Sequence, residues 1–143
     1  MQEEDIIQVM NDPPAKELMN SNNPARLAYN GLDGFPRVIP IGFFWNGTQF
    51  VMGTATNSPK MKALQTNPNV ALTIDTTTFP PHVLLVRGTA SVEIVEGVAP
   101  EFLEASRKYV GAEQWEAFEA QVHATYKQQG RITIAGMGEN LGL

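Results

Sequence analysis

The residues from His82 to Val95 form one long stretch in which apolar side chains occupy every second position. The apolar face of this stretch consists of Leu84, Val86, Gly88, Ala90, Val92 and Ile94. At about 3.3 Å per residue, a straight strand of this length would extend beyond a small domain. We therefore expect the strand to bend, with Gly88 as the natural position for a bend or bulge. Strands of this kind wrap around a barrel and join two sheets, so we expect a mainly β fold.

Asn46-Gly47 is the strongest hairpin signal in the chain. It is expected to join a second strand at Arg37–Trp45 to a third strand at Thr48–Met52, with residues 43–45 opposite residues 48–50. Antiparallel pairing in this register would place the start of the second strand beside the segment that follows the third. The hairpin therefore predicts that Arg37 lies at the same end as the Gly53–Lys60 loop and supplies a second cation for an anion site there.

The second strand contains unusual residues. Pro40 has no backbone N–H to donate, so the strand should lie at a sheet edge or carry a bulge. Gly42 allows another backbone or a ligand to approach closely. The aromatic residues that follow, Phe43, Phe44 and Trp45, are difficult for one small barrel to bury together. We expect part of this aromatic cluster to lie in a subunit interface.

The remaining elements follow from apolar periodicity and from breaker residues. Further strands are expected at Arg26–Asn30, Val70–Asp75 and Arg131–Ala135. Helices are expected at Glu4–Met10, Ala15–Met19, Ala99–Val110 (ended by Gly111) and Glu113–Lys127. At 143 residues the chain is expected to form one domain. Its segments would be an N-terminal helical segment (1–24), a barrel core (25–95), the helices (99–128), a last strand (131–135) and a loose tail (136–143).

A further helix is expected to start within the segment that joins the third and fourth strands. Ser58 is a good N-cap, and Pro59 occupies the first helical position, where its missing N–H costs nothing. Asn67-Pro68 would stop the helix after about three turns.

The first turn of this helix carries Lys60 and Lys62, and no acidic residue occurs from Thr54 to Asn69. A helix N-terminus carries partial positive charge, so lysines there are unfavourable unless an anion is bound. Open N–H groups, a hydroxyl and an ammonium group together are typical of a phosphate site. The two lysines lie on nearly opposite sides of the helix, and we favour Lys60 because it is nearer the cap. The alternative is that both lysines are solvated surface residues.

Composition limits the functional classes. The absence of cysteine excludes disulfides, iron–sulfur clusters and thiolate nucleophiles, and it fits a reducing cytoplasm. The two histidines make a histidine-rich metal site unexpected, and the net charge of −5 disfavours general nucleic-acid binding. The acidic N-terminus is unlike a secretory signal, and no apolar run approaches bilayer length.

The sequence does not identify a catalytic acid or base. The glutamates at 93, 96, 101 and 104 lie on polar faces and are expected to be solvated. His82 follows Pro80-Pro81 and is expected to be an ordinary strand-end residue. If the protein is an enzyme, its chemistry is expected to come from a cofactor, with the protein supplying binding and orientation.

Several motifs, taken in order, resemble the pyridoxamine 5′-phosphate oxidase-like split-barrel proteins, which bind flavin or deazaflavin. The motifs are Arg37-x-x-Pro40, the Asn46-Gly47 hairpin, Thr54-x-x-x-Ser58-x-Lys60, Leu64-x-x-Asn67-Pro68-x-Val70-Ala71-Leu72 and Arg87-Gly88-Thr89-Ala90. The likeness covers Pro24 to Val95. Pro59 and Val83 stand where the oxidase itself usually has Arg and Gln. The chain also lacks the Pro and Trp that end many relatives.

The resemblance implies a six-stranded antiparallel split barrel with flanking helices, assembled as a homodimer with cofactors at the interface. It implies that Arg37, Thr54, Ser58 and Lys60 hold the phosphate of FMN or of the deazaflavin F420. Residues Val38, Ile39, Pro40 and Ile41 would lie along the isoalloxazine ring.

The leading functional hypothesis is an FMN-dependent oxidoreductase that transfers hydride to or from an unidentified small molecule. F420 is the second candidate cofactor, but it needs more cations than one phosphate does, and the nearby candidates are Lys62, Arg26 and Arg87. Two further hypotheses are a non-catalytic flavin- or haem-binding dimer and a dimer without a cofactor. A haem would need His82, His123 or a tyrosine as its axial ligand.

Overall fold

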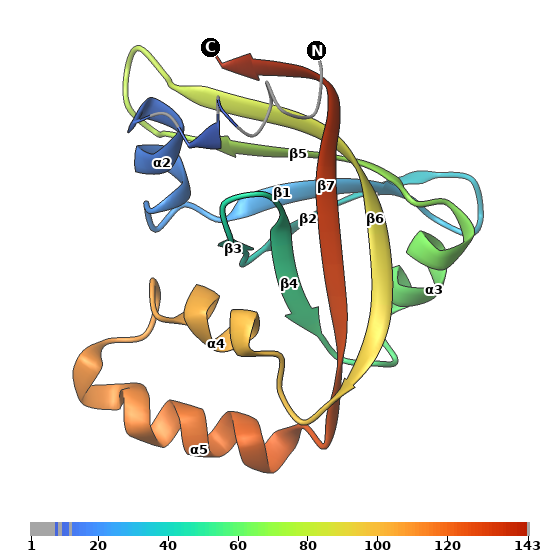
Figure 1. Cartoon of the computed structure of the whole chain (residues 1–143), viewed down its shortest axis with the longest axis vertical. Helices are drawn as coiled ribbons and strands as arrows, with labels where there is room; N and C mark the ends of the chain where they lie inside the picture. The colour runs from blue at the N-terminus through green and yellow to red at the C-terminus, as the bar shows by residue number, and fades with distance from the viewer. Residues whose placement is uncertain (1–7, 9, 12, 143) are drawn as a thin grey trace.

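Figure 1 shows a strongly curled antiparallel sheet with helices at its margins. The structure, a computed structural model, describes residue 8, residues 10 and 11, and residues 13–142. Its strands are β1 (Ala25–Asn30), β2 (Pro36–Ile41), β3 (Phe44–Trp45), β4 (Phe50–Thr54), β5 (Asn69–Asp75), β6 (Val83–Glu96) and β7 (Gln128–Gly142). Its helices are α2 (Pro13–Met19), α3 (Pro59–Thr66), α4 (Pro100–Ser106), the 3₁₀ helix η1 (Ala112–Gln114) and α5 (Trp115–Thr125). The helix expected at Glu4–Met10 lies mostly outside the described residues.

The described strands form one sheet in the order β2-β1-β5-β6-β7-β4-β3. The mainly antiparallel class and the flanking helices are therefore confirmed. There are seven strands rather than six because the strand predicted at Arg37–Trp45 divides after Ile41. Its first part, β2, pairs with β1, and its second part, β3, pairs with β4. As Pro40 predicted, β2 lies at the edge of the sheet.

The hairpin between β3 and β4 forms at the predicted place but in a different register. Trp45 pairs with Phe50 and Phe44 with Val51, so the loop has four residues rather than two. The reason is the Asn46 side chain, whose Oδ1 accepts hydrogen bonds from the backbone N–H groups of Thr48 and Gln49. This side-chain turn competes with the two-residue hairpin that the dipeptide favours.

The long strand β6 bends where the sequence predicted. Its pairing with β7 shifts register between Val86 and Gly88. A Cβ at Gly88 would lie 2.6 Å from the carbonyl oxygen of Ala135, so only glycine fits this close approach of the two strands. The apolar face ends sooner than the alternation indicates, because Ile94 is 59% exposed.

The last strand is longer than predicted. Residues 136–142 were expected to be a loose tail, but β7 continues through them and pairs with Leu84–Val86 of β6. The first part of β6 is long enough to offer this segment an unpaired edge. Backbone pairing needs no particular side chains, so a glycine-rich segment can complete the ladder.

The two helices at one end of the sheet, α4 and α5, are both shorter than predicted. α4 ends at Ser106 rather than at Val110, and Gly111 has an extended backbone (φ −65°, ψ 152°) instead of ending a helix in the left-handed region. α5 lies alongside α4, through an edge-on contact of the Phe102 and Tyr126 rings and a stacking of Arg107 on Trp115. α4 stands beside β4, α5 lies on the far side of α4, and both are away from α3 (Figure 1).

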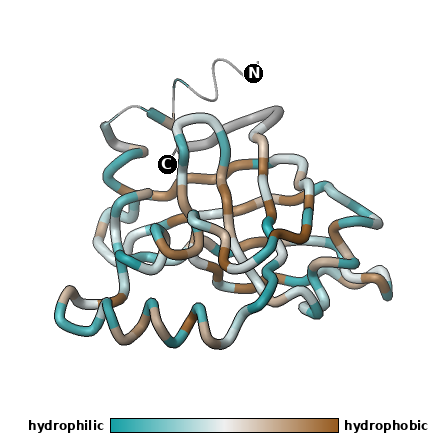
Figure 2. The backbone as a smooth tube through the Cα atoms, turned by 60° about the horizontal axis from the view of Figure 1, so that its bottom comes forward, coloured by the Kyte–Doolittle hydropathy of each residue, from teal (hydrophilic) through white to brown (hydrophobic). Residues whose placement is uncertain are grey.

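The hydrophobic core lies inside the curl of the sheet, where the brown segments of Figure 2 gather. Its largest fully buried side chains include Phe43, Phe50, Leu27, Met52, Leu72, Ile74, Ile132 and Ile134. Phe43 packs edge-on against Phe50, and Trp45 lies on the other side of Phe50. The aromatic cluster expected in an interface is thus largely packed within the chain.

Among the helices that the structure describes, none has the length and apolarity to cross a membrane.

Candidate functional site

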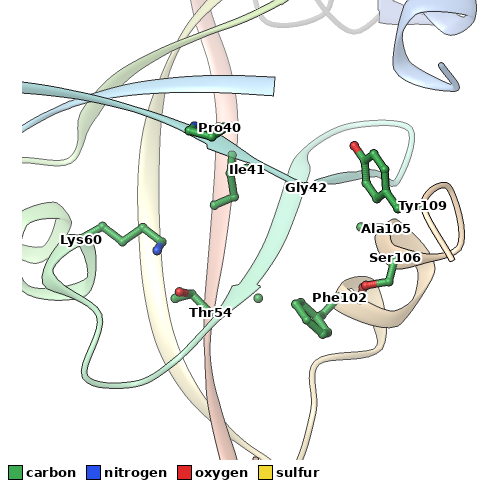
Figure 3. Close-up of a pocket in the computed structure, with 10 residues that line it drawn as sticks. Pro40, Ile41, Gly42, Thr54, Lys60, Phe102, Ala105, Ser106 and Tyr109 are labelled. Atoms are coloured by element: carbon green, nitrogen blue, oxygen red, sulfur yellow. The ribbon is translucent and has the colours of Figure 1, made fainter. Parts of the chain in front are cut away.

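A cavity of about 330 Å³ opens between β2, β4, α3 and α4. Figure 3 shows Lys60 entering it from the α3 side, Thr54 at its floor, and Phe102 and Tyr109 on the opposite wall. The cavity is lined by Pro40, Ile41, Gly42, Gly53, Thr54, Lys60, Phe102, Ala105, Ser106 and Tyr109. Four separate segments meet here, which is the usual arrangement of a ligand pocket.

The end of β2 and the end of β4 build the floor and one wall. After Ile41 the chain leaves the ladder with β1, so the backbone at Gly42 is not part of a strand. At Gly53, a Cβ would lie 2.8 Å from the Phe102 Cβ and 2.8 Å from the Gln129 Oε1. Glycine at this position lets α4 approach β4 closely, and this approach forms the pocket.

Lys60 and Ser58 form the polar end of the pocket. Pro59 starts α3 and Ser58 occupies its N-cap position, as predicted, but the Ser58 hydroxyl does not cap the helix. It accepts a hydrogen bond of 2.8 Å from the Lys60 Nζ instead. The helix has eight residues, shorter than the predicted three turns.

Burial lowers the pKa of Lys60 below its ordinary value. Among the described residues that line the pocket, none is acidic, so no carboxylate there neutralises this ammonium group. Lys62, two residues further on, is exposed and is not part of the lining. The preference for Lys60 over Lys62, made from helix geometry, agrees with this difference in burial.

The α4 side supplies the aromatic wall. Phe102 and Tyr109 face the pocket, and the Ser106 hydroxyl is turned back to the carbonyl oxygen of Phe102 at 2.8 Å. Burial raises the pKa of the Tyr109 phenol, which therefore keeps its proton at neutral pH. This wall presents apolar rings together with one hydroxyl donor.

The start of α4 is fixed to the sheet by two polar contacts. Arg131 of β7 donates two hydrogen bonds to the Glu101 carboxylate, at 2.9 and 3.1 Å. The fully buried Gln129 accepts a hydrogen bond of 3.0 Å from the backbone N–H of Ala99. Glu101 is therefore not the solvated residue that its polar helix face predicted. The Arg131 guanidinium lowers the pKa of the Glu101 carboxyl, and the carboxylate raises that of Arg131.

The structure brings together part of the predicted site. Pro40, Ile41, Thr54 and Lys60 line the pocket, and Ser58 is bonded to Lys60. Arg37, Val38 and Ile39 precede these residues in β2 and are not part of the lining. The Arg37 guanidinium is held by Asp33 at 2.8 Å and by the Phe35 carbonyl oxygen at 3.0 Å.

The hairpin argument for Arg37 was wrong because β2 pairs with β1 and not with β4. Val38 is 66% exposed, whereas Ile39 packs against the core. Whether Arg37, Val38 and Ile39 contact a cofactor stays a prediction that follows from the family resemblance.

Sequence reasoning missed the α4 wall. Phe102, Ser106 and Tyr109 share one face of the predicted helix, so a signal was present. The sequence does not show which strand this helix face packs against. The contact of Phe102 with Gly53 joins residues that are far apart in the chain, so it depends on the whole fold. Arg131, which fixes α4 through Glu101, was likewise assigned no role.

Other candidate residues lie away from this pocket. His82 is exposed, and its backbone N–H donates to the Thr76 hydroxyl. Glu93 is bound to Arg131, and Glu96 accepts from the Gln128 side chain. Within the described part of the chain, no three His, Cys, Asp or Glu side chains gather in a way that could hold a metal ion.

Comparison with known proteins identifies the family of this chain. A sequence model described as pyridoxamine 5′-phosphate oxidase matches residues 12–135, which include every residue of the pocket lining. The chain belongs to the pyridoxamine 5′-phosphate oxidase family. A comparison with curated protein sequences gives no match.

Solved structures share the fold of this family member at low sequence identity. An F420 reductase aligns with a TM-score of 0.59 and 20% identity, covering 86% of this chain and 93% of its own. A conserved hypothetical protein from Mycobacterium tuberculosis has a TM-score of 0.64 and 21% identity, with 99% and 84% covered. The haem storage protein HutZ from Vibrio cholerae has a TM-score of 0.63 and 16% identity, with 91% and 92% covered. The fold of this chain is thus shared by proteins named for F420 and for haem.

Proposed function

We propose that the pocket binds FMN and that the protein is an oxidoreductase transferring hydride between the flavin and a small molecule. The observation that carries this proposal is the polarity of the pocket. A partly buried ammonium group without a carboxylate partner lies at one end, and aromatic and backbone surfaces lie at the other. An elongated ligand with an anionic end and a flat apolar end matches this arrangement.

The polar end has the donors that a phosphate group requires. Lys60 offers its Nζ, and Ser58 and Thr54 offer hydroxyl groups. The hydrogen bond from Lys60 to Ser58 holds two of these donors together. The residues present therefore fit a phosphate monoester.

The other end has the surfaces that a flat ring requires. Pro40, Ile41 and Gly42 offer main chain that is unpaired on its outer side, since β2 is an edge strand. Phe102 of α4 and Tyr109 of the segment after α4 face them.

A bound flavin would supply the hydride chemistry, and the chain's own residues would bind and orient it. Phe102 would exclude water from the ring, and the protonated Tyr109 hydroxyl would be available as a hydrogen-bond donor at the pocket opening.

F420 remains the second candidate because an F420 reductase shares the fold. Its longer anionic tail needs additional cations. Lys60 is the one cationic residue among the described residues of the lining. Arg26 is 3.8 Å from Asp75, and Lys62 is exposed. With one cationic side chain in the lining, the pocket favours FMN, which has a single phosphate, over F420.

Haem is the third candidate because HutZ shares the fold. Neither His82 nor His123 lines the pocket, so Tyr109 is the axial ligand that a haem there would need. Burial raises the pKa of the Tyr109 phenol, which disfavours the phenolate that would bind the iron. The proposal also includes a homodimer, as the family resemblance implies, and a cytoplasmic location, which the cysteine-free sequence fits.

Titration of the purified protein separately with FMN, F420 and haem tests the choice of cofactor. We expect FMN to bind with quenched flavin fluorescence and a stoichiometry of one per chain, more tightly than F420. We expect no Soret shift with haem. Tighter binding of F420, or a haem Soret band that persists after gel filtration, would replace FMN by that cofactor. Failure of all three to bind would remove the oxidoreductase proposal.

A further inference from the structure

Lys108 connects the turn after α4 to the opposite side of the molecule. It lies two residues beyond the end of α4, and its Nζ donates a hydrogen bond of 2.7 Å to the carbonyl oxygen of Met19, the last residue of α2. The same Nζ lies 4.0 Å from the centre of the buried Phe43 ring. Both contacts favour a cation, because a helix C-terminus and an aromatic face each carry partial negative charge. Burial lowers the pKa of Lys108 to about 8, so most molecules carry the ammonium form at pH 7.

The next residue, Tyr109, lines the proposed flavin pocket. After α4 ends at Ser106, the backbone N–H groups of Tyr109 and Val110 both donate to the Ser106 carbonyl oxygen at 3.0 Å, so the chain forms a tight turn. The Tyr109 ring comes close to Gly42, where a Cβ would lie 3.7 Å from its Cε2 (Figure 3). Because Tyr109 is 47% exposed, its position depends on the turn that carries it more than on its own packing.

The contacts of Lys108 and of Tyr109 meet on one short segment of the chain. Phe43 lies under the Lys108 amine. The residue before it, Gly42, faces the Tyr109 ring. Arg107, which precedes Lys108, contacts α4 and the start of α5 instead. The Lys108 side chain therefore holds the turn against the same segment that the Tyr109 ring approaches.

We propose that Lys108 is a positioning residue, whose ammonium group holds Tyr109 at the ring end of the pocket and thereby strengthens flavin binding. This inference rests on the proposed flavin-binding function. A ligand binds more tightly when the groups that contact it are already in place, because less conformational entropy is lost on binding. Lys108 does not line the flavin pocket but a separate cavity of about 300 Å³ between α2 and the β3–β4 hairpin. Its effect on the flavin therefore acts through its neighbours.

A double-mutant cycle at pH 7 tests whether Lys108 acts through Tyr109. Riboflavin is the probe because it is neutral, so losing a positive charge elsewhere in the protein does not alter its attraction to the pocket. The cycle combines Lys108→Met, which keeps the apolar stem, with Tyr109→Ala. We expect each single variant to lower the riboflavin affinity about fivefold, and the double variant to lower it no further than Tyr109→Ala alone. Additive losses, or an unchanged affinity in Lys108→Met, would overturn the proposal.

Two further variants separate positioning from the loss of a charge. Lys108→Arg keeps a cation that donates hydrogen bonds, and it should restore most of the riboflavin affinity. Lys16→Met removes an exposed lysine from the wall of the same 300 Å³ cavity and should leave the affinity unchanged. Equal losses in Lys16→Met and Lys108→Met would assign the effect to charge. A folded Lys108→Arg protein that binds riboflavin as weakly as Lys108→Met does would also contradict the positioning role.

Hydrogen exchange, measured by NMR, tests the positioning without any flavin. Lys108→Met should speed the exchange of the Tyr109 and Val110 amides about fivefold or more, because their turn opens more often. The amide of Leu72, in the central strand β5, should exchange as in the parent. Equal exchange at Tyr109 in both proteins would overturn the positioning role.

The two measurements distinguish this inference from the proposed function. If neither riboflavin nor FMN binds the parent, the proposed function and the effect on flavin binding are both wrong, while hydrogen exchange still decides whether Lys108 holds Tyr109. If flavin binds but the cycle is additive, only the role of Lys108 is wrong. Should Lys108→Met not fold, Lys108→Gln replaces it, because the glutamine amide ends one bond short of the position of the lysine amine.

Discussion

Among single residues, Lys60 and Lys62 provide a matched pair for testing the pocket. They belong to the same turn of α3, but Lys60 is partly buried in the pocket wall and Lys62 is exposed. We predict that Lys60→Ala weakens FMN binding about 10- to 150-fold. This corresponds to about 1.5–3 kcal/mol for a charge-assisted contact to phosphate. Lys62→Ala should change the affinity less than twofold. Fluorescence titration measures both, and equal losses would contradict the assignment.

Gly42 provides the second test at this scale. A Cβ there would have only one atom from elsewhere in the described chain within 4 Å, Cε2 of Tyr109 at 3.7 Å. The backbone therefore tolerates a side chain, which would project toward the pocket. We predict that Gly42→Val lowers FMN affinity and leaves the melting temperature within a few degrees of the parent. A destabilised protein with unchanged FMN affinity would show that Gly42 serves packing instead.

The difference between Lys60 and Arg37 shows what the sequence could predict at single residues. Lys60 was chosen from the phase of one helix, which is local information, and it lines the pocket. Arg37 was placed by extending strand pairing across Gly42, and the chain leaves the sheet there. The Arg37 guanidinium binds Asp33 within its own turn instead. Local geometry was predictable, whereas a contact that depended on an uninterrupted strand was not.

At the scale of elements, the position of α4 depends on the ion pair between Glu101 and Arg131. The two side chains are 20% and 26% exposed and are joined by two hydrogen bonds. We predict that Glu101→Ala lowers the free energy of unfolding by about 1 kcal/mol at pH 7 and weakens FMN binding by loosening the Phe102 wall. Glu104→Ala is the control, because that carboxylate forms an exposed pair with Arg107. Chemical denaturation measures the first effect and FMN titration the second.

The same ion pair predicts a pH dependence. Arg131 lowers the pKa of Glu101 from its ordinary value of 4.5, so the pair stabilises the fold above that value. The contribution is lost as the pH falls through the lower pKa of the folded state. The difference in stability between the parent and Glu101→Ala should therefore be constant from pH 7 to about pH 5 and shrink below pH 4.5. A difference that stayed constant to pH 3 would contradict the pairing.

The helices and strands were predictable where the apolar periodicity and the breaker or capping residues indicate the same boundary. The bend of β6 at Gly88 and the start of α3 at Ser58-Pro59 are local features with one strong signal each. The extension of β7 through residues 136–142 was missed because its cause is the free edge of β6, not its own composition. The early end of α4 was missed because its residues remain helix-compatible up to Tyr109.

At the scale of the whole molecule, the exposed apolar residues indicate where a second copy would bind. Phe35 and Val38, on the β1–β2 hairpin, are 69% and 66% exposed, and β2 is an edge strand. Neighbouring exposed apolar residues of this size are typical of interfaces. We predict a homodimer at micromolar concentration, which Val38→Lys weakens at least tenfold and Ile94→Lys does not. Sedimentation velocity measures the dissociation, and a monomer at these concentrations would contradict the prediction.

The measurement that tests the phosphate-binding pocket most directly compares FMN with riboflavin, which lacks the phosphate. Both are titrated into the parent protein and into Lys60→Ala. We predict that FMN binds the parent at least tenfold more tightly than riboflavin does. In Lys60→Ala this preference should largely disappear, because the riboflavin affinity stays unchanged while the FMN affinity falls. Equal affinities of FMN and riboflavin for the parent, or an FMN preference that survives in Lys60→Ala, would contradict a phosphate site at Lys60.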